Sequence, residues 1–181
     1  MRISSQYDWL NHVDGLPKMV AEGVKLGKIN TTEVSGIKSN PEIMAMAKEA
    51  GVERIYTRDE VAWCAVAMVV LALRAGKKVN FSSYARLRAK SFTDFGNAVK
   101  VPMLGDVLVF FREGGHHVGL YVGEDETCYH VMGGNQSNQF NVTRILKTRM
   151  IAARRPIYNV QPAAVKRIYL KASGDISENE G

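Results

Sequence analysis

The stretch Ala62–Gly76, AWCAVAMVVLALRAG, constrains the fold more than any other part of the chain. It is apolar on every face, so as a helix it has to be buried on all sides rather than lie on a surface. Its valines would also permit a buried strand. Its length, its Ala-Gly ending and the preceding Thr57–Glu60, which has the form of a capping box, favour a helix.

Helical patterns precede this stretch and strand patterns follow it. We expect helices over 9–27, 41–50 and 82–90, the last capped by Ser82 or Ser83. After Pro102 the pattern alternates, and Gly, Asn and acidic turns separate five expected strands: 106–111, 116–122, 127–132, 140–145 and 151–155. Helices followed by a run of strands indicate an α+β domain with an antiparallel sheet.

One domain, residues 1–156, is expected to hold this core. Residues 157–181 then form a C-terminal extension, and we expect its polar end, from about Ser173, to be disordered. The length of 181 residues and the 46% of hydrophobic residues suit a single buried core.

The formal net charge of +6 suggests an anionic partner, such as nucleic acid, anionic lipid or the teichoic acids and carboxylates of a bacterial wall. The basic residues are scattered, and no stacking-aromatic or groove-helix module accompanies them. We therefore do not expect nucleic-acid binding.

The N-terminal sequence lacks the apolar core of a secretory signal. The longest uncharged stretch, 61–73, is shorter than the roughly 20 residues that cross a membrane. We expect a protein made in the cytoplasm without a signal peptide or transmembrane segment. Action outside the cytoplasm would then require release or delivery by another agent.

Cys64 is the first candidate for chemistry. A thiol near a helix N-terminus gains thiolate character from the unpaired N–H groups there. If the helix starts at the Thr57 cap, Cys64 lies in the second turn and gains little, whereas a break near Val61 would place it in the first turn. The alternative is an inert core residue. With only one other cysteine, Cys128, no disulfide framework is indicated.

The pair His116-His117 follows two glycines at the start of an expected strand. Alternation places His116 on the face of Val118 and the core, and His117 on the face of Gly119, where there is room for a partner. A histidine there can act as general base for a thiol. The alternative is two polar residues at a strand end.

The segment Gly133–Gln136 is expected to close the third strand. Asn135 could fix the imidazole tautomer and Gln136 could donate toward an oxyanion, or the segment could be a plain turn. His130 is a rival for the third position. Cys128 and the histidines could also bind a metal, but their spacing matches no structural zinc pattern, so no metal or other cofactor is expected.

Four motifs in order carry a resemblance: Asp59–Cys64 (DEVAWC), Gly105–Phe110 (GDVLVF), His117–Gly123 (HVGLYVG) and Gly133–Gln136 (GGNQ). Together they resemble CHAP and NlpC-type cysteine peptidases, and more narrowly a phage and bacterial branch of peptidoglycan hydrolases that carries Gly-Gly-Asn-Gln. The resemblance covers roughly residues 9–156.

The resemblance implies a papain-like α+β core, with a helix headed by the nucleophile packed on an antiparallel sheet that carries the base. It assigns Cys64 as nucleophile, His117 as base and Asn135 as the group that orients the imidazole, with His130 as the alternative third member. Gln136, Trp63 and Asp59 are the candidates for substrate or oxyanion contacts.

The implied activity is cleavage of an amide bond in the stem peptide of peptidoglycan, as an amidase or an endopeptidase, by a phage lysin or a wall-degrading effector. Bacterial peptidoglycan is the expected partner, and an immunity or holin-type protein is a further candidate. The alternatives are a non-catalytic wall-binding or virion structural protein with the same fold, and another acyl-transfer enzyme.

Overall fold

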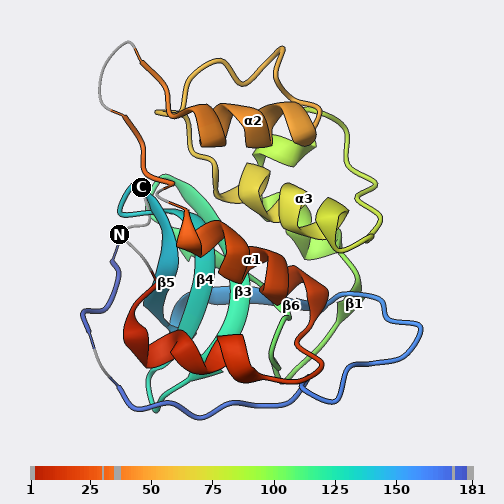
Figure 1. The fold of residues 1–181 in the computed structure, drawn as a ribbon, viewed down its shortest axis with the longest axis vertical. Coiled ribbons are helices and arrows are strands. Elements are labelled where there is room, and N and C mark those ends of the chain that lie inside the picture. Colours follow the sequence, from red (N-terminus) through yellow and green to blue (C-terminus); the bar gives the residue numbers. More distant parts are fainter. Residues whose placement is uncertain (1–2, 30, 35–37, 173, 179–181) are drawn as a thin grey trace.

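The computed structural model describes residues 3–29, 31–34, 38–172 and 174–178. It confirms a mixed α+β architecture with a six-stranded antiparallel sheet in the order β1-β6-β2-β3-β4-β5 (Figure 1). The strands are β1 Asn97–Ala98, β2 Val107–Arg112, β3 Gly115–Glu124, β4 Cys128–Gln136, β5 Gln139–Leu146 and β6 Met150–Arg155. All five strands expected from alternation are present. The two-residue strand β1 was not expected, since it is too short to show a period.

The helices differ more from expectation. They are the 3₁₀ helix η1 Ser5–His12, α1 Lys18–Lys28, α2 Pro41–Glu49, α3 Cys64–Arg74, and the 3₁₀ helices η2 Ala85–Leu87, η3 Ala89–Asp94 and η4 Lys147–Arg149. The single helix expected over 9–27 is wrong. Gly15 has a φ of +65° and Pro17 immediately precedes α1, so the chain turns between η1 and α1.

Two other helix predictions have different outcomes. α2 is confirmed, and the Asn40 side chain accepts a hydrogen bond of 2.8 Å from the N–H of Glu42 as its N-cap. The helix expected over 82–90 is replaced by η2 and η3. Ser82 remains at their start, where its hydroxyl accepts from the N–H of Ala85 at 3.4 Å.

Of the two starts left open for this helix, the one at the Thr57 cap is wrong, and the later start, which places Cys64 in the first turn, is confirmed because α3 begins at Cys64. The reason is the carboxylate of Asp59, which is fully buried and accepts hydrogen bonds from the N–H groups of Val34 (3.0 Å) and Asn40 (2.7 Å). These contacts fix residues 57–63 as a non-helical connection. The thiol of Cys64 therefore lies in the first turn.

The expectation that this helix is buried on all sides is confirmed, since every residue from Cys64 to Ala72 is buried. α3 and α1 lie over one face of the sheet, and α2 lies beside α3 (Figure 1). The sheet contributes one face to this core through Val118, Leu120, Val122 and Met132. A smaller apolar cluster on the other face contains Phe110, Tyr121 and Val131.

The C-terminal segment runs back along the sheet after β6 (Figure 1). The N–H of Glu124 donates to the carbonyl of Ile168, and the N–H of Leu170 donates to the carbonyl of Glu124, both at 2.8 Å. Farther on, the N–H of Ser177 donates to the carbonyl of Arg144 at 2.8 Å. Residues 173 and 179–181, part of the end for which disorder is expected, lie outside the described residues.

Candidate active site

Cys64 lies where the start of α3 meets β3. Burial raises the pKa of its thiol, and several neighbours act in the opposite direction: hydrogen bonds from the backbone of Val118, Ala65 and Cys64 itself, and the positive charge of Arg112. The raised pKa means that burial outweighs them. The resting group is therefore a neutral thiol held by N–H groups at a helix N-terminus.

His117 is fully buried, and its Nε2 lies 3.0 Å from Oε1 of Gln136. The amide nitrogen of Gln136 donates to the carbonyl of Val131 (3.1 Å) and to both the carbonyl and Oδ1 of Asn141 (2.9 Å each). Because the amide NH₂ faces these acceptors, the amide oxygen faces the imidazole. The network thus assigns the proton to Nε2 and the lone pair to Nδ1.

The strand register agrees with the expected faces. Val118, Leu120 and Val122 pack in the core under α3, whereas Tyr121, two residues from Gly119, packs in the cluster on the other face. Because side chains alternate along a strand, the side chain of His117 lies on the same face as Tyr121. The thiol of Cys64 is hydrogen-bonded to the backbone of the next residue, Val118, so Cys64 lies beside the start of β3, one residue along the strand from His117.

The four residues of the Gly-Gly-Asn-Gln motif have separate places. They lie within β4 at a register shift, rather than in a turn that closes it. A Cβ on Gly133 would lie 3.4 Å from Oε1 of Gln136, and a Cβ on Gly134 would overlap the ring of Trp63. Asn135 adopts a φ of +58°, and Gln136 reaches back to His117.

The imidazole therefore donates its hydrogen bond to Gln136, the residue after the one that the resemblance nominates. Asn135 is buried at the bulge next to it. The expectation that Gln136 donates toward an oxyanion is wrong, because its NH₂ is used by Val131 and Asn141.

His130 is not the third member of this site. Its Nδ1 lies 2.7 Å from the hydroxyl of Tyr7 on η1, and its Nε2 lies 3.0 Å from Oδ2 of Asp125. Asp125 also accepts from Nε of Arg144 at 2.7 Å. With both ring nitrogens engaged in this network, His130 has none left to orient His117.

Asp59 and Trp63 precede Cys64 in the chain and help to position the start of α3. Both are fully buried, and both are engaged in hydrogen bonds within the protein. Nε1 of Trp63 donates to Oε1 of Glu33 at 2.8 Å, and Asp59 holds the backbone of Val34. We therefore assign them to positioning the start of α3 and not to the substrate contacts for which they were candidates.

Two residues of the neighbourhood are missed by sequence reasoning. Glu33 comes from a polar loop with no motif. Arg112 ends β2 next to the turn that leads to the two histidines, and pairing of the expected strands would have placed it beside them.

The remaining metal-ligand candidates do not converge. Among the described residues no group of three His, Cys, Asp or Glu side chains could hold a metal ion. His116 is partly exposed and stacks edge-on against Phe111, with ring centroids 6.2 Å apart. Within the same part of the chain, no helix has the length and apolar character needed to cross a bilayer.

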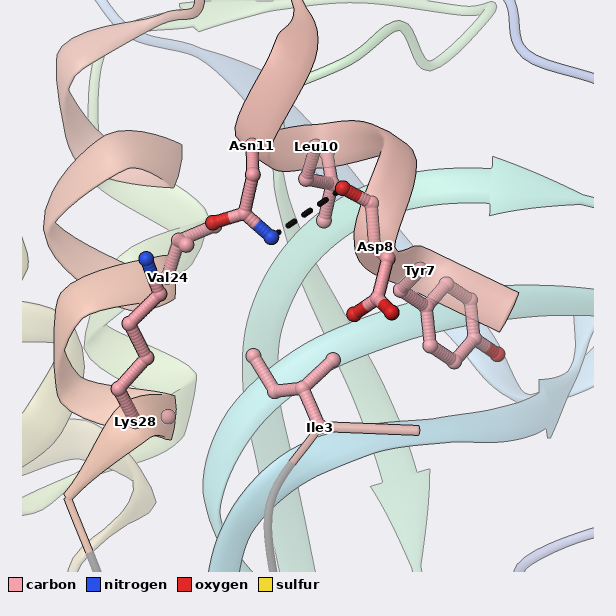
Figure 2. A pocket seen from close by; sticks show the side chains of 8 residues that line it. Ile3, Tyr7, Asp8, Leu10, Asn11, Val24 and Lys28 are labelled. Carbon is pink, nitrogen blue, oxygen red and sulfur yellow. Dashed lines mark hydrogen bonds between the residues drawn. The ribbon is translucent and has the colours of Figure 1, made fainter. Parts of the chain in front are cut away.

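A cavity of about 400 Å³ lies between η1 and α1, away from this site (Figure 2). Its lining includes Tyr7, Asp8, Asn11 and Lys28, and the Nδ2 of Asn11 donates to the carbonyl of Asp8 at 3.1 Å across its rim. None of the residues from the four motifs lines it.

Comparisons with models of protein families, with curated proteins and with solved structures find no match for this chain.

Proposed function

We propose that this protein is a cysteine hydrolase with a papain-like arrangement, in which Cys64 is the nucleophile, His117 the base and Gln136 the group that orients the imidazole. The hydrogen bond from His117 to Gln136 carries the proposal. The accepting amide oxygen of Gln136 is held in place because the NH₂ of the same amide donates to Val131 and Asn141. The thiol of Cys64, at a helix N-terminus, is hydrogen-bonded to the backbone of Val118, the residue after His117.

The raised pKa of Cys64 determines how such a pair would work. A neutral thiol needs a base at the moment of attack, and Nδ1 of His117 carries the lone pair that can take its proton. Sulfur then bonds to the amide carbon, the leaving amine takes the proton from His117, and a thioester remains. Water, deprotonated by His117, hydrolyses the thioester and restores the thiol.

We propose the stem peptide of peptidoglycan as the substrate class, with amidase and endopeptidase cleavage both open. Support comes from the resemblance of the four motifs and from a basic chain whose net charge of +6 suits an anionic wall. A phage lysin or a delivered wall-degrading effector would use this chemistry. A holin or an immunity protein would be the corresponding partner.

The test is the loss of turbidity of purified peptidoglycan with wild type and Cys64→Ala. We expect clearance by wild type and a rate lower by several orders of magnitude for the variant. Equal clearance by both folded proteins would refute the assignment of Cys64.

One observation favours a second candidate, a wall-binding protein without catalysis. Cys64 is only 4% exposed and His117 is fully buried. A binding protein would cosediment with peptidoglycan and release no new amine, in both wild type and Cys64→Ala. Release of amines by wild type alone would exclude it.

A further inference from the structure

Arg112 lies on the same face of the sheet as His117. In the antiparallel pair of β2 and β3, Phe110 is opposite His117 and Arg112 is opposite Gly115. Residues two apart on a strand share a face, so Arg112 is the diagonal neighbour of His117. Such neighbours lie about 7 Å apart, within reach of a long side chain.

The same cation also acts on the thiol. The charge of Arg112 favours the thiolate form of Cys64. Arg112 is thus the diagonal neighbour of His117 on the adjacent strand, and its charge acts on Cys64 at the start of α3.

Open space adjoins this cation. A Cβ built on Gly115, the cross-strand partner of Arg112, would meet nothing within 4 Å. At the other side of His117 on the same face the space is closed, because a Cβ on Gly119 would lie 2.5 Å from Cγ1 of Val131. The less crowded end of this face is therefore the hairpin end, where Arg112 lies.

We propose that Arg112 is the anion-recognition residue of this site and binds a carboxylate of the peptide whose amide bond Cys64 attacks. A guanidinium can hold a carboxylate through two parallel N–H···O bonds, which fixes orientation as well as adding affinity. The inference rests on the proposed function and adds a substrate class to it: stem peptides with a free carboxylate near the scissile bond, rather than amidated ones.

The first experiment alkylates Cys64 with iodoacetate and with iodoacetamide, and locates the label by peptide mass spectrometry. The two reagents are similar in size and differ in charge, and their rate ratio cancels any change in the thiolate fraction. We expect the iodoacetate preference of Cys64, relative to a small model thiol, to fall about tenfold in Arg112→Gln. Arg54→Gln removes an exposed positive charge elsewhere and should leave the ratio unchanged.

An equal ratio in wild type and Arg112→Gln would overturn the inference, as would native Cys64 that neither reagent labels. Unchanged thermal unfolding of Arg112→Gln ensures that the ratio is measured on folded protein.

The second experiment compares peptidoglycan with free and with amidated stem carboxylates. Arg112→Gln should raise KM on the free acid about tenfold and leave the amidated polymer unaffected. Hydrolysis without this difference would overturn the role of Arg112 while the proposed function stands. If wild type hydrolyses neither polymer, the proposed function fails, and the alkylation ratio still decides whether Arg112 receives an anion at Cys64.

Discussion

At the scale of single residues, the site depends on which side chain fixes the imidazole of His117. Sequence order placed Asn135 in that role by resemblance, but the choice between Asn135 and Gln136 depends on the register shift in β4. The exclusion of His130 depends on Tyr7, which is 123 residues away in the chain. Neither fact has a local signal, so sequence could identify the motif but not the residue within it.

Gln136 can be tested against its neighbour. Gln136→Ala should lower kcat about 100-fold or more, because the imidazole loses the acceptor that fixes its tautomer. Asn135→Gly removes the neighbouring side chain and suits the φ of +58°, so it should cost less than about tenfold. Steady-state kinetics on soluble stem-peptide fragments measures both, and a larger loss in Asn135→Gly would return the role to Asn135.

Gln136→Glu gives a directional check on the same contact. A carboxylate at the 3.0 Å position of the amide oxygen would stabilise the imidazolium and raise the pKa of His117. The base would then be protonated up to a higher pH. The acidic limb of the pH–rate profile should move to higher pH, and an unmoved limb would contradict the contact.

At the scale of elements, strands were easier to predict than helix ends. Alternation is a local property, and it located the five longer strands correctly. The start of α3 stayed open between two positions, because the choice depends on the hydrogen bonds that Asp59 accepts from Val34 and Asn40, whose positions depend on the fold. The break before α1 had local signals in Gly15 and Pro17, but the apolar spacing on both sides hid them.

Contact between α3 and β4 requires a residue without a side chain at position 134. Gly134→Ala should destabilise the protein by about 1–3 kcal/mol, because the new methyl group overlaps the Trp63 ring and lies 3.0 Å from Cβ of Ala67. The matched control is Gly115→Ala, also on a strand, where nothing lies within 4 Å and the change should stay within about 0.5 kcal/mol. Urea unfolding of the two variants provides the comparison, and equal effects would contradict this packing.

At the scale of the whole molecule, one buried carboxylate adds to the backbone hydrogen bonds that join the C-terminal segment to the sheet. Glu124 accepts hydrogen bonds from Nε (2.8 Å) and Nη2 (3.0 Å) of Arg167, and its Oε2 lies 2.7 Å from Nζ of Lys147. Burial alone would raise the pKa of Glu124, but hydrogen bonds from Arg167 and Lys147 outweigh it and lower the pKa to about 2.

Because the pKa of Glu124 is lower in the folded than in the unfolded protein, its ionised carboxylate stabilises the fold at pH values above the ordinary pKa of a glutamate. This stabilisation is lost as the pH falls through the folded-state pKa. The free-energy gap between wild type and Glu124→Gln should therefore narrow by on the order of 2 kcal/mol between about pH 5 and about pH 3. Urea unfolding at both pH values measures the gap. A gap that stays constant or widens on acidification would show that Glu124 is not held ionised by these partners.

The claim that Cys64 cuts an amide bond is tested most directly by mass spectrometry of muropeptides after digestion with wild type and with Cys64→Ser. We predict that wild type alone yields a pair of fragments whose summed mass exceeds the parent by one water, with a new amine and a new carboxylate at a single amide bond. The same fragment pair from folded Cys64→Ser, or no fragments from wild type, would contradict it.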